Sequence, residues 1–301
     1  MLGIDIGGSA IKIGLVSEDG AVVGRDLLPV DRSLAFEPLM DRIAAQCRAL
    51  ERKASRQATA IGVATPGHVD PESGILVDGA VNIPQLMNKP LRHAITQRLA
   101  RPVAVENDGT AATLGEMRYG AGRGLKRFAL VVFGTGVGGG IAIDGKVIGG
   151  AKGEPPELGA IVLDPGAGSA GKPAGTFEHL AASSGFLRAY SRFGGDLEGM
   201  TAERLFERAD QNDGTALRAI DYTARFIAQA FGMLINALNL EACIIGGGLA
   251  SAGDRLAGPI RRHLPDFTWP LLLAGSSVRL AETGNDAGVL GAAALAEASA
   301  E

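Results

Sequence analysis

The run Glu106-Asn107-Asp108 places three polar side chains in succession at the end of an apolar segment. The preceding PVAV is typical of a buried strand, and the following TAATLGE is typical of a helix. A carboxylate at the carboxyl end of such a strand lies where the ligand crevices of α/β proteins open. Asp108 is therefore a candidate general base that takes a proton from a hydroxyl group. The structural alternative is an N-cap, because Asp or Asn here also satisfies the first helical N–H groups.

Three glycine-rich segments follow apolar strands, and such segments let backbone N–H groups converge on a phosphate. None is a Walker loop, and the first two continue into strands, which argues against a dinucleotide fingerprint. Each one alone is also compatible with a simple tight turn. Together they predict a nucleotide lying in a cleft between two domains. The segments are DIGGSAIK (Asp5–Lys12), FGTGVGGG (Phe133–Gly140) and IIGGGLA (Ile244–Ala250).

Asp5 and Lys12 are the charged residues of the first segment. A carboxylate at the end of an apolar strand is costly unless it is paired or metal-bound, and beside phosphates it would hold hydrated Mg²⁺. Lys12 is either a phosphate contact or an ordinary exposed strand lysine. The predicted nucleotide contacts are Asp5, Gly7, Gly8, Ser9, Lys12, Gly134, Thr135, Gly136, Gly246, Gly247 and Gly248.

The order of elements repeats within the chain. A strand, a glycine turn, a second strand, an Asp-Gly turn and a third strand begin near residue 2 and again near residue 128. This repeat predicts two duplicated α/β domains. We place the N-terminal domain at residues 1–115, closed by a C-terminal helix at 286–301, and the larger domain at 116–285. Hydrophobic spacing predicts helices at about 36–53, 176–193 and 215–240.

The composition suits a two-domain globular protein, with 301 residues, 46% of them hydrophobic and 21% charged. The net charge of −4 and the absence of basic runs longer than two residues argue against a nucleic-acid or membrane partner. The two cysteines lie far apart, and the chain starts without a signal-peptide pattern. We therefore expect a cytoplasmic protein without disulfides.

Over essentially its whole length the sequence resembles the ROK family of sugar kinases and related regulators. The motifs occur in the family's order: DIGGSAIK, GVATPG, VENDGTAATLGE, VFGTGVGGGIAIDGKVIGG and IIGGGLA. The resemblance implies the actin-like ATPase (ribonuclease H-like) fold, with ATP and Mg²⁺ between the domains and a sugar beside them. It also implies a transferase of carbohydrate metabolism, a glucokinase-like, ATP-binding hexose kinase.

The resemblance also assigns site residues. Asp108 falls on the catalytic base, and Asn107 and Asp108 would contact sugar hydroxyls. Asn82, Glu157 and Glu178 fall on further sugar-facing positions. The ordinary alternatives are a solvated loop carboxylate for Glu157 and a helix-dipole contact for Glu178.

Two departures from the family pattern concern a histidine and the zinc motif. Ala160 stands where the family has a histidine near the anomeric end of the sugar. The cysteine positions of the zinc motif are occupied by Ser169, Gly171 and Thr176. The sequence therefore predicts no structural zinc and altered reading of the anomeric carbon.

Other functions remain open from the sequence. A loose basic cluster would suit polyphosphate as donor in a gluco/mannokinase; it comprises Arg118, Arg123, Lys126 and Arg127. An N-acylhexosamine is an alternative sugar. A different class is a catalytically inactive, sugar-binding ROK protein. A homodimer is the usual expectation for such a soluble enzyme.

Overall fold

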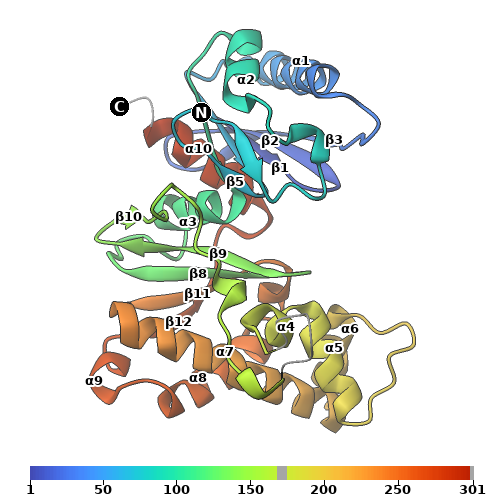
Figure 1. Cartoon of the computed structure of the whole chain (residues 1–301), viewed down its shortest axis with the longest axis vertical. Helices are drawn as coiled ribbons and strands as arrows, with labels where there is room; N and C mark the ends of the chain where they lie inside the picture. Colours follow the sequence, from blue (N-terminus) through green and yellow to red (C-terminus); the bar gives the residue numbers. More distant parts are fainter. Residues whose placement is uncertain (168–174, 299–301) are drawn as a thin grey trace. The chain divides into compact units, whose positions relative to one another are not determined.

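The computed structural model describes residues 1–167 and 175–298, and the chain forms two compact units (Figure 1). Unit 1 comprises Met1–Arg123, Val147–Pro156 and the residues from Glu282 onward. Unit 2 comprises Gly124–Lys146 and Glu157–Ala281. The chain therefore leaves unit 1 near Arg123 and returns to it at Glu282. The domain limits at residues 115 and 285 stay sequence-based predictions.

Unit 1 is built on a five-stranded sheet in the order β3-β2-β1-β4-β7. The first three strands form an antiparallel meander, while β4 and β7 run parallel to β1. Parallel strands bring their carboxyl ends to one edge of the sheet, which is where ligands bind in α/β proteins. The strands are β1 (Leu2–Ile6), β2 (Ala10–Val16), β3 (Val22–Pro29), β4 (Ile61–Thr65) and β7 (Val103–Asn107), with a small hairpin of β5 (His68–Val69) and β6 (Leu76–Asp78).

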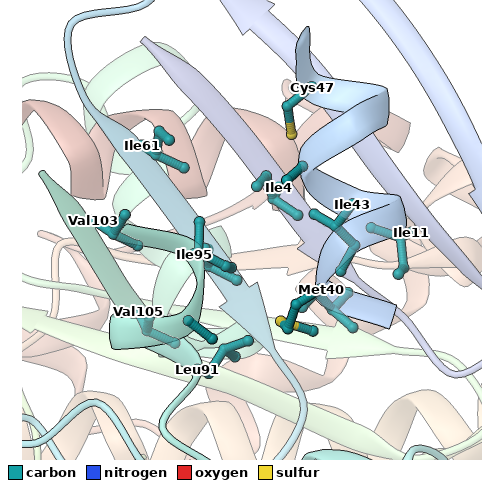
Figure 2. Close-up of a cluster of buried hydrophobic side chains, with 14 of the residues drawn as sticks. Ile4, Ile11, Met40, Ile43, Cys47, Ile61, Leu91, Ile95, Val103 and Val105 are labelled. Atoms are coloured by element: carbon teal, nitrogen blue, oxygen red, sulfur yellow. The ribbon is translucent and has the colours of Figure 1, made fainter. Parts of the chain in front are cut away.

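One face of this sheet is covered by α1 (Phe36–Ala54) and α2 (Leu91–Leu99). Met40, Ile43 and Cys47 recur on one side of α1 and lie in the same buried cluster as Ile4 and Ile11 of the sheet (Figure 2). The sequence-predicted helix at 36–53 is thus present with its apolar face inward.

The other face is covered by α3 (Asp108–Tyr119) and α10 (Ala287–Ala298). Side chains alternate between the two faces of a strand, so Gly3 and Gly62 point away from α1. A Cβ at position 62 would lie 1.6 Å from the carbonyl oxygen of Ala292, so the close packing of α10 on β4 requires glycine there.

Unit 2 repeats the same plan. Its sheet has the order β10-β9-β8-β11-β12, with an antiparallel β8–β9 pair and with β11 and β12 parallel to β8. The matching strand orders confirm the prediction of two duplicated α/β halves. The strands are β8 (Phe128–Phe133), β9 (Val137–Ile143), β10 (Lys146–Val147), β11 (Ala242–Gly246) and β12 (Ser277–Leu280).

The helices of unit 2 include the long α7, whose N-terminus is capped by Asp213 through the N–H groups of Thr215 and Ala216. Among the described residues, no helix is both long and apolar enough to span a bilayer. The helices are α4 (Phe177–Ala181), α5 (Ser183–Arg192), α6 (Ala202–Asp210), α7 (Gly214–Leu238), α8 (Asp254–His263) and α9 (Pro270–Leu273). The short 3-10 helices of both units are η1 (Pro84–Leu86), η2 (Leu158–Ala160), η3 (Pro165–Ala167), η4 (Gly248–Ala252), η5 (Leu264–Asp266) and η6 (Gly284–Asp286).

The prediction of one continuous helix at 176–193 is wrong. The chain is extended at Ala182 (φ −67°, ψ 169°), which separates α4 from α5. Neither glycine nor proline marks this break. It is held instead by Ser183, whose N–H and hydroxyl both donate to the carbonyl of Gly134, each at 2.9 Å. A tertiary contact therefore overrides the local helix preference.

Candidate active site

Asp5 and Asp108 come to the same edge of the unit 1 sheet. β1 is parallel to β4, with Asp5 opposite Ala64, and β4 is parallel to β7, with Thr65 opposite Asn107. Asp108 begins α3 directly after β7. In this register Glu106 of β7 lies in line with Asp5, and Asp108 follows two residues later, so the two carboxylates lie at the same sheet edge and Asp108 feels the charge of Asp5.

Asn107 caps α3 and ties it to a neighbouring turn. Its side-chain oxygen accepts hydrogen bonds from the N–H groups of Gly109 (2.9 Å) and Thr110 (3.1 Å). Its amide nitrogen donates to the carbonyl of Gly67 at 2.9 Å. The capping role considered for Asp108 thus falls mainly on Asn107. The Asn107 side chain also hydrogen-bonds to the Asp108 carboxylate and so opposes the rise of its pKa.

Asp108 has a carboxylate suited to proton transfer. One face of the residue is open to solvent, and its Oδ1 accepts a hydrogen bond from the N–H of Gly109 at 2.8 Å. The surrounding protein removes water from the other sides and raises the pKa of Asp108 to about 6; the negative charge of Asp5 adds to the rise, and the Gly109 hydrogen bond opposes it. Such a group is ionised at pH 7 and basic enough to accept a proton.

Asp5 is mostly buried, with 18% of its side chain exposed, and burial raises its pKa while Lys12 opposes the rise. The Lys12 Nζ lies 3.9 Å from Asp5 Oδ2 and donates to the carbonyl of Asn285 at 3.1 Å. Gly288, in the first turn of α10, lies directly against the Asp5 carboxyl group. Lys12 is therefore engaged in an ion pair rather than being an isolated surface lysine.

The first glycine turn lies beside Asn82. The N–H of Gly7 donates to the carbonyl of Ala10 at 3.0 Å, which closes the turn between β1 and β2. A Cβ at Gly8 would lie 3.0 Å from the Cβ of Asn82. Asn82 and Ser9 are exposed. The structure thus brings this predicted sugar-facing residue against a predicted phosphate turn.

Two further residues of unit 1 support the site and were missed from the sequence. The Glu106 carboxylate accepts the N–H of Asn107 at 2.7 Å, and its pKa is raised by burial. Arg32 donates to the carbonyl of Gly8 at 3.2 Å. Glu106 belongs to the E-N-D run and could have been found there, whereas nothing around Arg32 signals its contact.

In unit 2 the second and third glycine turns lie side by side. The N–H of Gly134 donates to the carbonyl of Gly136 at 3.0 Å and closes the second turn. Gly247 has a left-handed backbone (φ +80°), and a Cβ there would lie 2.3 Å from the carbonyl oxygen of Phe133. Only glycine allows this approach. Gly247, Gly248 and Thr135 are exposed, so their backbones are open to a ligand.

Glu178 lies against the second turn. Its Oε2 accepts the N–H of Val137 at 3.1 Å, and Gly136 packs directly beside the same oxygen. Gly159 of η2 contacts the Cβ of Glu178. Glu157 and Ala160, at the two ends of η2, are both exposed. This part of unit 2 thus gathers the predicted sugar contacts Glu157 and Glu178.

Of the three former zinc positions, Ser169 and Gly171 lie outside the described residues. Thr176 caps α4, because its hydroxyl accepts the N–H of His179 at 3.2 Å. Within residues 1–167 and 175–298, no group of three or more His, Cys, Asp or Glu side chains could hold a metal ion.

Comparison with known proteins places these features in a family. A sequence model of the ROK family matches residues 1–299. The chain is 34% identical to a glucokinase of Halalkalibacterium halodurans, covering 96% of this chain and 92% of that protein. It is similar to the ROK hexokinase of Thermus thermophilus (29% identity, TM-score 0.82, 100% and 98% of the two chains). It is also similar to a ROK family glucokinase of Streptomyces griseus in complex with glucose and AMPPNP (29% identity, TM-score 0.78, 99% of each chain).

These similarities extend over the whole chain and confirm the predicted actin-like ATPase fold. The motif order, the duplicated sheets and the family match agree. The chain belongs to the ROK family.

Proposed function

We propose that this chain is a hexose kinase, which transfers the γ-phosphate of ATP to a sugar hydroxyl with Asp108 as general base. The observation that carries the proposal is the Asp108 carboxylate, with a pKa raised to about 6, beside Asp5 at the ligand-binding edge of the unit 1 sheet. Glucose is the first sugar to test, because the similar proteins include glucokinases.

Phosphoryl transfer to an alcohol depends mainly on positioning and on neutralising charge. The sugar hydroxyl gives its proton to Asp108 while its oxygen bonds to the γ-phosphorus. The bond from that phosphorus to the bridging oxygen of ADP breaks, and a hexose phosphate and ADP leave. Asn107 holds the start of α3 through its cap, orients the Asp108 carboxylate and is a proposed sugar contact. Asn82, Glu157 and Glu178 are the further proposed sugar contacts.

The glycine turns are the proposed phosphate sites, since their exposed backbones can direct N–H groups to oxygen atoms. Asp5 fits a Mg²⁺ ion that keeps most of its waters, because its carboxylate is shielded yet, among the described residues, faces a single cation, Lys12, at 3.9 Å. The ion, when bound, neutralises phosphate charge. Lys12 would approach the same phosphates.

Three further properties are proposed with the activity. Both cysteines of the described chain are free and buried, which suits a reducing cytoplasm. The positions of the family's zinc-binding cysteines carry no thiolate in this chain, which suits an enzyme without structural zinc. A homodimer is the commonest assembly for soluble enzymes.

The structure weakens the basis for polyphosphate as donor. Arg118 pairs with Glu297 at 2.8 Å, and Arg127 pairs with Asp144 at 3.0 Å. With the Arg123–Glu282 pair at 4.0 Å, these ion pairs engage three of the four residues of the basic cluster that suggested a polyanion. ATP is therefore the proposed donor.

The test is ADP release over a panel of glucose, mannose, fructose and N-acetylmannosamine with ATP, repeated as sugar phosphate formation with polyphosphate. We expect glucose-dependent ADP release. Folded protein that binds a hexose but releases no ADP with any of the four would instead favour an inactive sugar-binding protein.

A further inference from the structure

A groove in unit 2, separate from the residues of the candidate active site, runs between α7 and α8, which are labelled in Figure 1. Its volume is about 730 Å³, within the range of small-molecule sites. Phe193, at the end of α5, also lines it. The basic lining residues are Arg218 and Arg225 of α7 and Arg255, Arg262 and His263 of α8.

The arginines of α8 are neutralised by acidic partners. Arg255 pairs with Asp210, and Arg262 pairs with Asp221, each at 2.6 Å. His263 shares the Asp221 carboxylate at 3.0 Å. Asp254, the other acidic lining residue, pairs with Arg261 at 2.7 Å, so both carboxylates of the groove lining already have a basic partner.

The arginines of α7 are different. No carboxylate among the described residues lies within ion-pair distance of Arg218 or Arg225. The guanidinium of Arg218 stacks over Phe193, and that of Arg225 stacks over Phe267, with distances to the ring centroids of 5.6 and 5.5 Å. Arg218 Nη2 also donates a long hydrogen bond to Thr215 Oγ1 at 3.5 Å. Stacking orients the flat face of a guanidinium and leaves its other edge N–H groups open to an anion.

A third arginine adds to the same positive surface. Arg192 lies over the ring of Tyr222, 5.2 Å from its centroid, and it too has no ion-pair partner in the described chain. Arg192 does not line the groove, but Tyr222 does, so this arginine adds positive charge beside the groove in a protein whose net charge is −4.

The spacing of the two α7 arginines defines the shape of a ligand. Arg218 and Arg225 are seven residues apart, so they share one face of the helix at a rise of about 10 Å. Tyr222 lies between them and offers its hydroxyl group for hydrogen bonding. Leu217, Ile220 and Pro259 supply apolar surface.

We propose that the α7–α8 groove binds a small anion with two phosphate ends, one held by Arg218 and the other by Arg225. Sugar bisphosphates and inorganic oligophosphates share this chemistry. Each of these two arginines can donate two parallel N–H hydrogen bonds to the oxygens of one phosphate. The site does not depend on the proposed phosphoryl transfer.

The test is isothermal titration of the full chain at low salt with fructose 1,6-bisphosphate, tripolyphosphate and, as a single-phosphate control, fructose 6-phosphate. The variant is Arg218→Gln/Arg225→Gln. The matched control is Arg52→Gln/Arg56→Gln at the exposed end of α1, which removes the same charge elsewhere. We expect binding to weaken by about tenfold or more in the first variant and little in the second. Saturating AMPPNP should not displace the ligand.

Stronger binding of fructose 1,6-bisphosphate would support the site and assign it to a sugar bisphosphate, and stronger binding of tripolyphosphate would support it and assign it to an oligophosphate. Four results would overturn the proposal: no binding of either probe, equal loss in both variants, displacement by AMPPNP, or equally tight binding of fructose 6-phosphate. Kinase activity measured without these probes should be unchanged in the groove variant, so a failed groove and a failed kinase assignment are separable.

Discussion

Glu116 accepts two hydrogen bonds from Thr283, one from its N–H at 2.9 Å and one from its hydroxyl at 2.5 Å. Its other oxygen accepts the N–H groups of Ala121 (2.7 Å) and Glu282 (3.2 Å). Glu116 is completely buried. Ala121 lies just before the chain leaves unit 1, and Glu282 is where it returns. One carboxylate thus fastens both crossing segments to the end of α3.

Glu116→Ala should lower the free energy of unfolding by about 3 kcal/mol or more, because several buried N–H groups lose their acceptor together. Urea denaturation measures this change, and hydrogen exchange should quicken at the amides of residues 121 and 283. Glu116→Gln, which keeps one acceptor oxygen, should cost less. A loss below about 1 kcal/mol in the alanine variant would mean that water replaces the carboxylate there.

Asp108→Asn should lower kcat by about 10²–10⁴, the usual contribution of a positioned proton acceptor. Glucose binding measured by titration should persist, because Asn107 still caps α3. Asp19→Asn, at an exposed turn of unit 1, is a matched control and should leave kcat unchanged. Retention of more than about a third of kcat in Asp108→Asn would show that another group is the base.

The dependence of kcat/KM on pH should report the ionisation of Asp108. A base must be ionised, and the pKa of Asp108 is about 6, so kcat/KM should fall about tenfold per unit as the pH drops below 6. The acidic limb should be missing from the residual activity of Asp108→Asn. A profile whose acidic limb is the same in both proteins would assign it to a different group.

The purified protein should contain no structural zinc. Thr176 serves as a helix cap, and positions 160, 169 and 171 carry neither imidazole nor thiolate. Elemental analysis measures this directly, and thermal stability should be insensitive to a chelator that spares Mg²⁺. About one zinc per chain would require other ligands.

Ala160→His should change kcat/KM unequally among hexoses. A histidine supplies a donor and an acceptor that alanine lacks, and each hydrogen bond to a sugar hydroxyl contributes about 0.5–1.5 kcal/mol. Glucose should gain most if it is a weak native substrate. Ala151→His, at an exposed turn, is the control and should leave kcat/KM unchanged for every hexose. The same change across glucose, mannose, fructose and N-acetylmannosamine would show that position 160 does not read the sugar.

The sequence predicted the duplicated sheets and glycine turns because apolar strands that end in glycine leave a local pattern. It did not predict the break at Ala182, because that break depends on the distant Gly134 carbonyl. It also did not reveal Glu116, since a glutamate in a helix usually faces water and only the fold supplies its four donors. The sequence also did not single out Arg218 and Arg225 of α7, because the absence of acidic partners around them within the described chain follows from tertiary packing.

The position of α10 has a consequence for synthesis. This helix covers β1 and β4, yet it is translated after all of unit 2. At about 5–20 residues per second, roughly ten to thirty seconds separate the emergence of α3 from that of α10. During that time the alanine-lined face of β4 that receives Ala292 stays uncovered on the ribosome. Unit 1 therefore completes its folding only after unit 2 and α10 have been translated, and a chain truncated before residue 287 should depend on chaperones and aggregate without them.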